Sequence, residues 1–235
     1  MERKCALFML VLAATVLFVA GPCATRLHAG EHKVLNDMCG NVVEVPVNPK
    51  RIASMHCVSS ERIYILGQGE RLCLMGKQSP WAYRLFPEIR NVPTVSGSAT
   101  EQIREVKPDL VLHTTGMFKG KGEELKAAGF TTVCAFTAEK RARTVDDFIA
   151  EFKRQMRFYG DLLGPAARAR ADRYCAYFDR KIKAILAITS KIGEKDRPSV
   201  YYGWKGGKPF SSQGAGSTLH WDTEIAGGTY LPQVK

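Results

Sequence analysis

Residues 106–116, VKPDLVLHTTG, place a proline and an aspartate before a run of strand-forming residues and close it with polar residues and a glycine. Leu110 to His113 is therefore predicted to be a short buried strand, because apolar runs bounded by turn formers are typical of sheets covered on both faces. Open α/β sheets hold their ligands at the carboxyl ends of such strands. His113, Thr114 and Thr115 are accordingly candidates for a binding site, with capping of the sheet as the alternative.

Strand-like and helix-like segments alternate on both sides of this stretch. Strands are predicted at residues 42–45, 51–55, 72–75, 94–95 and 131–135. Helices are predicted from a cap at Ser59 or Ser60 to the Gly67 stop, and over residues 101–106 and 123–128. Repeated strand–helix units of this kind indicate an α/β fold with a mostly parallel sheet covered by helices.

The pattern becomes helical after residue 143. Thr144 suits a helix N-cap, and apolar residues recur at helical spacing from Val145 to Leu163. Gly164-Pro165 interrupts this helix, and a second helix is predicted to continue to about Ile192. A strand over residues 199–202 and a helix over residues 217–226 are predicted to follow.

The N-terminal residues have the organisation of a signal peptide. Charged residues 2–4 precede the uncharged apolar run 5–20, which is shorter than the roughly 20 residues of a membrane span. We expect residues 1–29 to be removed and the exported chain to begin at Gly30. Pro22 stands before Cys23 where a lipid-attachment signal has a small residue, which argues against a lipid anchor.

The exported chain is basic. Removing Arg3, Lys4, Arg26 and Glu2 lowers Lys+Arg from 34 to 31 and Asp+Glu from 23 to 22, leaving a net charge of about +9. For an exported protein this charge argues for anionic ligands or a negatively charged membrane surface rather than nucleic acid. A solvated basic surface is the alternative.

The cysteines do not form a recognisable framework or metal motif. Five remain after residues 1–29, at scattered positions: Cys39, Cys57, Cys73, Cys134 and Cys175. Buried thiols are the default interpretation, and one disulfide is compatible with an oxidising compartment.

Several stretches, taken in order, resemble one family. They are DMCGNVVEVP (37–46), NPKRIAS (48–54), SSERIYILG (59–67), WAYRLFPEI (81–89), NVPTVSGSATEQIREVKPDLVL (91–112), LKAAGF (125–130), YGDLLG (159–164), RPSVYYG (197–203) and TEIAGG (223–228). This series resembles the periplasmic solute-binding proteins of ABC importers for iron-siderophore complexes, haem and cobalamin. The resemblance implies two α/β lobes with parallel sheets, joined by a long rigid helix, with the ligand in the cleft between the lobes.

The resemblance also implies a division of the chain. Residues 30–143 would form the N-terminal lobe, residues 144–192 the connecting helical region, and residues 193–235 the start of the C-terminal lobe. Only 43 residues follow position 192, too few to bury an independent core, so we expect an incomplete, truncated C-terminal lobe.

Cleft residues are expected on loops at the carboxyl ends of the strands. The predicted ligand-binding residues of the first lobe are His56, Ser59, Trp81, Tyr83, Ser98, His113 and Thr114, and those of the second are Tyr202 and Trp204. Aromatic side chains suit large flat chelates such as a ferric siderophore, haem or cobalamin, and histidine can ligate iron directly. His56 and His113 are therefore candidate metal ligands, although a hydrogen-bonded structural role is the favoured interpretation of His56.

The resemblance assigns partners as well as a ligand. Glu101 resembles the exposed acidic residue through which these proteins dock on the permease, although a carboxylate favoured at a helix N-terminus explains it equally. The expected partners are an ABC permease and its ATPase. We expect a monomer that has no intrinsic cofactor and does not bind nucleic acid.

Two other functions compete with this interpretation. An exported enzyme is disfavoured, because the sequence contains no GxSxG, HExxH or GxxxxGK[ST] motif. A binding protein for a bare zinc or manganese ion would need ligands from both lobes, and the candidates are His56, His113 and His220 with Asp222 or Glu224. The resemblance to chelate-binding proteins favours the larger ligand.

Overall fold

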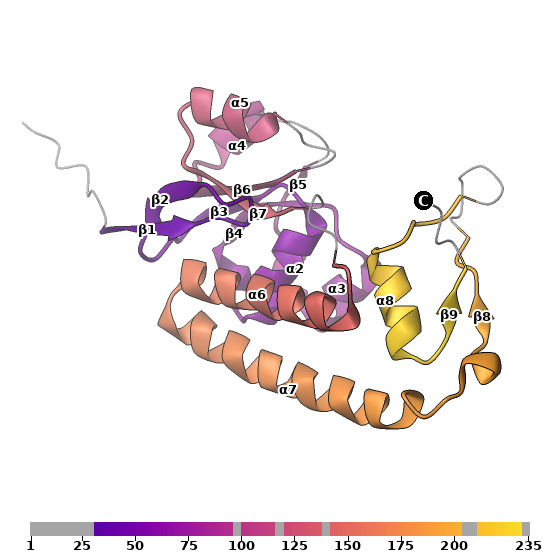
Figure 1. The fold of residues 1–235 in the computed structure, drawn as a ribbon. Helices are drawn as coiled ribbons and strands as arrows, with labels where there is room; N and C mark the ends of the chain where they lie inside the picture. Colours follow the sequence, from indigo (N-terminus) through magenta and orange to yellow (C-terminus); the bar gives the residue numbers. More distant parts are fainter. Residues whose placement is uncertain (1–30, 96–99, 116–119, 138–141, 204–210, 232–235) are drawn as a thin grey trace, which may run out of the picture. The chain divides into compact units, whose positions relative to one another are not determined.

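A five-stranded parallel sheet organises the chain. The computed structural model describes residues 31–95, 100–115, 120–137, 142–203 and 211–231, and the chain divides into two units after Gly30. The sheet has the order β5-β4-β3-β6-β7, and all its pairs are parallel (Figure 1). Its strands are β3 Ile52–Ser54, β4 Leu72–Gly76, β5 Thr94–Val95, β6 Leu110–Thr114 and β7 Thr132–Phe136. The predicted parallel α/β fold is confirmed.

Helices cover both faces of the sheet. Leu110 and Leu112 of β6 pack into one core cluster with α2 Cys57–Ile65, α6 Val145–Leu163 and α7 Pro165–Thr189. Val111, between them, packs into a second cluster with α4 Thr100–Glu105 and α5 Lys121–Ala127. All three side chains are almost fully buried, which stabilises the fold by about 1.5–3 kcal/mol for each. The remaining short elements of this part are α3 Pro80–Leu85, η1 Gly69–Arg71 and η2 Pro87–Ile89.

An antiparallel hairpin precedes the sheet. It pairs β1 His32–Asn36, which we did not predict, with β2 Val42–Pro46. The carboxylate of Asp37 organises the turn by accepting hydrogen bonds from the backbone amides of Cys39 (2.9 Å) and Asn41 (2.8 Å). It also accepts one from the amide of Cys134 in β7 (3.3 Å), which ties the turn to the edge of the sheet.

A disulfide reinforces this connection. Cys39 and Cys134 are joined across a sequence separation of 95 residues. The default interpretation of buried free thiols is therefore wrong for this pair, and the alternative of one disulfide is correct. Cys57, Cys73 and Cys175 are free thiols.

Two local predictions in the first half are corrected. α2 is capped by His56 rather than Ser59 or Ser60: His56 has extended backbone angles, and its Nδ1 accepts from the Val58 amide (3.3 Å). Ser60 lies inside the helix, where its hydroxyl donates to Ser54 (3.0 Å). The stretch containing Trp81 is a helix, α3, rather than a loop, because Pro80 occupies its first turn and fixes a helical φ.

The long helical region follows the sequence closely. The Thr144 side chain accepts from the Asp147 amide (3.0 Å) at the start of α6. Gly164, with φ of +104°, turns the chain, and Pro165 begins α7. α7 ends at Thr189, three residues before the predicted end. The Thr189 hydroxyl donates to the Ile225 carbonyl (2.9 Å), which ties the end of α7 to α8.

The last segment forms a small unit around α8 Thr218–Ile225. It contains η3 Glu194–Asp196 and the parallel pair β8 Ser199–Val200 and β9 Thr229–Tyr230. β8 is two residues shorter than predicted because only Ser199 and Val200 find partners in β9. Within the described residues, no helix combines the length and apolarity that crossing a membrane requires.

We predict that the disulfide carries a large share of the stability. Replacing both Cys39 and Cys134 by serine should lower the free energy of unfolding by about 2–4 kcal/mol, because the bond closes a long loop in the unfolded chain. Urea denaturation followed by circular dichroism measures this change. The control is Cys73→Ser, a half-buried free thiol in β4. Equal midpoints for the double variant and the native chain would contradict the prediction.

Candidate functional site

Three strand ends meet at the carboxyl edge of the sheet. His56 follows β3, and its ring stacks on Phe136 at the end of β7, with centroids 5.9 Å apart. Thr115 follows β6, and its hydroxyl donates to the hydroxyl of Thr137, which follows β7, at 3.0 Å. The polar residues after β6 therefore contact those after its neighbour β7.

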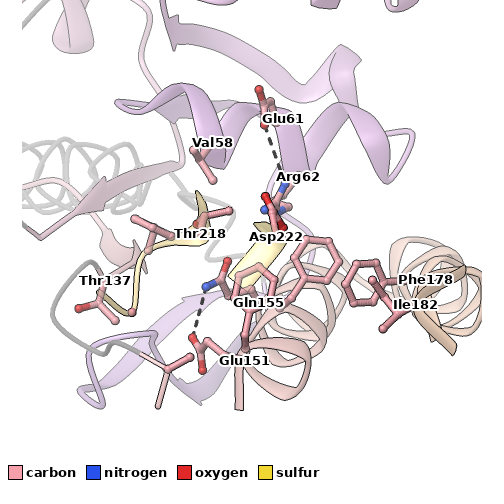
Figure 2. A pocket seen from close by; sticks show the side chains of 15 residues that line it. Val58, Glu61, Arg62, Thr137, Glu151, Gln155, Phe178, Ile182, Thr218 and Asp222 are labelled. Atoms are coloured by element: carbon pink, nitrogen blue, oxygen red, sulfur yellow. Dashed lines mark hydrogen bonds and ion pairs between the residues drawn. The ribbon is translucent and has the colours of Figure 1, made fainter. Parts of the chain in front are cut away.

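A cavity of about 530 Å³ opens beside this edge. Side chains from α2, α6, α7 and α8 turn toward it, together with the end of β7 (Figure 2). Its lining residues are Val58, Glu61, Arg62, Phe136, Thr137, Ala142, Phe148, Glu151, Phe152, Gln155, Phe178, Ile182, Gly216, Thr218 and Asp222. Residues at the edge of the main sheet and residues of the segment that contains α8 thus line the same cavity.

Aromatic side chains form one wall of the cavity. Phe148 and Phe152 lie one turn apart on α6, and Phe152 stacks on Phe178 of α7 with centroids 4.4 Å apart. The guanidinium of Arg62 lies 5.1 Å from the centroid of the Phe152 ring, which places a cation over an aromatic face. This wall can hold a flat or apolar surface and leaves a positive charge beside it.

Arg62 has a side-chain donor without a hydrogen-bond partner in the described part of the chain. This donor is its buried Nε, and its nearest carboxylate, Glu61, is 3.9 Å away. Glu151 accepts from Gln155 (Figure 2), and its carboxylate is paired with Arg154 at 2.7 Å rather than with Arg62. A ligand oxygen in the cavity would find an arginine whose donors are not saturated.

Burial raises the pKa of two acidic groups in the cavity wall. It raises the pKa of the Glu61 carboxyl, and the neighbouring Arg62 only partly opposes this effect. Burial also raises the pKa of the Asp222 carboxyl on α8. Both groups therefore hold a proton more readily than exposed carboxyls do.

His113 does not face this cavity. Its strand position matches that of Val111, on the face covered by α4 and α5, and its ring packs against Gly122. A Cβ at Gly122 would lie 2.4 Å from the His113 ring, so only glycine fits there. His113 instead lines a separate cavity of about 550 Å³ with Asp37, Glu123 and Lys126 among its neighbours.

The other predicted site residues are dispersed. Ser59 and Thr114 are buried, Tyr83 is half-buried, and Trp81 and Tyr202 are exposed. Ser98 and Trp204 lie outside the described residues. Glu101 is exposed in the first turn of α4. None of the predicted ligand-binding residues that are described lines the 530 Å³ cavity.

Of the residues that line it, Asp222 was named from the sequence, and only as a ligand in the bare-ion alternative. The aromatic residues and Arg62 were not predicted. Phe136 and Thr137 follow a predicted strand, so extending the strand-end argument to β7 would have found them. Phe148 and Phe152 have the spacing of a core-facing helix stripe and were interpreted only in that way. Arg62 carries no local signal, because its position depends on α6 packing against α2.

The histidines do not assemble a metal site in the described residues. No group of three or more His, Cys, Asp or Glu side chains there is arranged to hold an ion. His220 has a structural environment: its Nδ1 accepts from the Gly216 amide (2.9 Å), and its ring stacks on Trp221 at 4.2 Å.

Comparison with known proteins gives one family and one fold. Residues 76–226 match the family model described as periplasmic binding protein. None of the curated proteins matches this sequence. The molybdate periplasmic binding protein MolA of Haemophilus influenzae is 13% identical with a TM-score of 0.69, and the match covers 85% of this chain and 66% of MolA.

Two further solved structures share the fold. The ABC-type Fe3+-hydroxamate transport system protein of Saccharomonospora viridis is 23% identical with a TM-score of 0.63, over 85% of this chain and 70% of that one. The haem-binding protein HmuT is 19% identical with a TM-score of 0.61, over 90% of this chain and 66% of HmuT. The chain therefore spans less than two thirds of the length of some of these proteins, including MolA and HmuT.

We predict that His56 makes stability depend on pH. Burial lowers the pKa of His56 below its unfolded value of about 6.5, so protons favour the unfolded chain and stability falls as pH drops through these two values. His56→Asn keeps a good N-cap without a titrating group, and should make the decline between about pH 7.5 and 5 shallower. Part of the decline should remain, because burial also lowers the pKa of His113.

Urea midpoints across this pH range test the prediction. The matched control is His32→Asn, which changes an exposed histidine in β1. A decline with falling pH that is equally steep in His56→Asn and the native chain would show that His56 is not responsible.

Proposed function

The chain belongs to the periplasmic binding protein family, and from this membership we propose that it captures an iron chelate outside the cytoplasm and delivers it to an ABC importer. Solved structures with the same fold include a ferric-hydroxamate transport protein, a haem-binding protein, and BauB, a siderophore-binding protein bound to acinetobactin and ferric iron. The family and these neighbours are transport binding proteins rather than enzymes, so we expect a bound ligand and no chemical conversion.

The cavity at the sheet edge is the observation that carries this proposal. Its volume of about 530 Å³ falls within the 300–1,000 Å³ typical of small-molecule sites. Phe152 and Phe178 offer aromatic area at low entropic cost, and Arg62 offers donors to an anionic oxygen. This combination suits a chelate with an apolar or flat surface and an acidic edge, as in a siderophore complex or haem.

The proposed division of the chain fits the same function. We assign residues 30–143 to the first lobe, residues 144–192 to the connecting helices and residues 193–235 to the start of the second lobe. The cavity would then lie between lobes, because α2 and β7 supply one side and α8 supplies another. Residues 1–29 would direct export, and a permease with its ATPase would receive the ligand.

A ligand titration tests the function. We expect one of a panel of ferric siderophores, haem and cobalamin to quench the fluorescence of folded residues 31–235 with a dissociation constant in the micromolar range or below. Trp221, next to the cavity-lining Asp222, supplies a signal. Zinc and molybdate complete the panel, the latter because MolA shares the fold. Failure of every ligand to bind a chain that is folded by circular dichroism would contradict the proposal.

Two cavity variants test the site separately from the function. Arg62→Ala should weaken binding of an anionic chelate by about 10- to 100-fold, the range expected when a hydrogen bond to a charged group is lost. Phe152→Ala should weaken it through loss of the aromatic wall. Arg104→Ala, at an exposed position on α4, is the control. Ligand binding that is unchanged in both cavity variants would place the site elsewhere and leave the function intact.

We also predict that Glu101 contributes to permease docking. Glu101→Arg should lower stimulation of the importer's ATPase while leaving ligand affinity unchanged, because the residue is exposed on α4 and does not line the cavity. Glu105→Arg makes the same charge change at the other end of this helix and is the control. An equal effect of the two substitutions would indicate a general charge effect rather than a docking contact.

A further inference from the structure

The charges on α7 are sorted between its two sides. Asp172 and Asp179 are the acidic residues of this helix, and both are paired. Asp172 binds Arg157 of α6 (3.2 Å) and Arg168 (3.0 Å), and Asp179 binds Lys153 of α6 (2.8 Å). The acidic groups of α7 are therefore occupied on the side that packs against α6.

The opposite side of α7 is basic and exposed. Positions 173, 177, 180, 184 and 188 follow one another at steps of three and four residues and share one face of the helix. We call this the outer face of α7, and it comprises Arg173, Tyr177, Arg180, Lys181, Ala184 and Ile188, all exposed. The outer face contains no acidic residue, and none of its basic residues makes an ion pair with the described residues.

Apolar groups interrupt this basic stripe. Tyr177 is 50% exposed and Ile188 is 70% exposed. The ammonium of Lys181 lies 5.5 Å from the centroid of the Tyr177 ring. At least half of each of these two side chains, Tyr177 and Ile188, is therefore open to solvent in the described chain. Exposed aromatic and aliphatic groups between Lys and Arg are typical of helices that lie in the headgroup region of a membrane.

We propose that the outer face of α7 binds the anionic phospholipid headgroups of a membrane surface. The stripe from Arg173 to Ile188 runs about 22 Å along the helix axis at 1.5 Å per residue, which brings its charges onto one surface. Each Lys or Arg near an anionic bilayer contributes about 1 kcal/mol, and the attraction fades within a Debye length. Tyr177 and Ile188 add apolar contact that a purely electrostatic partner would not use.

Exposed Ile188 favours lipid over nucleic acid as the partner. Affinity for a nucleic-acid backbone comes from Lys and Arg on phosphates, and an isolated aliphatic side chain adds little there. At a bilayer the same side chain can enter the boundary between headgroups and acyl chains. The outer face does not line the proposed ligand cavity, so membrane binding and ligand binding are separable.

Such binding would change how the protein searches for its partner. A chain held weakly at the bilayer diffuses over a surface rather than through a volume, which raises its local concentration around an integral membrane protein. Because the attraction is electrostatic, the bound fraction would depend on ionic strength and on the proportion of acidic lipid.

Vesicle co-sedimentation tests the proposal. Residues 31–235, which carry all the described elements, are mixed with phosphatidylcholine vesicles with or without phosphatidylglycerol, at about 0.01 M salt and at about 1 M salt. We expect binding to the phosphatidylglycerol vesicles at low salt, with weak binding at high salt and to phosphatidylcholine alone. Arg173→Glu with Arg180→Glu should reduce the affinity at least about 30-fold, since each lost charge is worth about fivefold.

The control makes the same charge change elsewhere. Arg104→Glu with Lys126→Glu alters exposed basic residues of α4 and α5, which cover the other face of the sheet. Circular dichroism verifies that both double variants are folded. Equal losses in the two variants, equal binding to both vesicle types or no binding at low salt would overturn the proposal. Displacement from vesicles by duplex DNA at equal phosphate concentration would overturn the assignment to lipid.

Discussion

Burial of β6 between two helical layers is the constraint on which the rest of the structure depends. Leu110 and Leu112 pack under α2, α6 and α7, while Val111 packs under α4 and α5. A polar group within the buried part of such a strand would need a partner inside the core. Polar side chains are therefore concentrated where the strands end, and Thr115 and Thr137 meet at that edge.

The parts of the fold that the sequence predicts are those decided within a few residues. The Thr144 side chain caps α6 by accepting from the amide of Asp147, three residues later. Gly164-Pro165 separates two helices by backbone geometry alone. The cap of α2 could not be predicted in this way, because Ser60 is withdrawn into the core by a hydrogen bond to Ser54 of the preceding strand. α3 is different, because its start is visible in the sequence: Ser79 at the N-cap and Pro80 in the first turn are typical of a helix N-terminus.

The cavity contains none of the described ligand-binding residues that were predicted from the sequence. Strand periodicity places His113 on the same face as Val111 and away from the cavity. The two-residue repeat is visible in the sequence, but the position of a residue at a strand end does not tell which face its side chain occupies. Arg62 and Phe152 come from helices separated by most of the first half of the chain, and only their packing brings a cation over a ring. A single sequence does not encode that proximity in any local pattern.

The turn beside β7 has a consequence for solubility. β7 is the last strand of the sheet, and its outer edge could recruit a strand from another molecule. The Met38 amide donates to the Cys134 carbonyl (2.9 Å), Asp37 accepts from the Cys134 amide, and the disulfide fixes both contacts in place. The Cys39–Cys134 bond therefore holds the turn against the outer edge of β7, where it hinders pairing with a strand of another molecule.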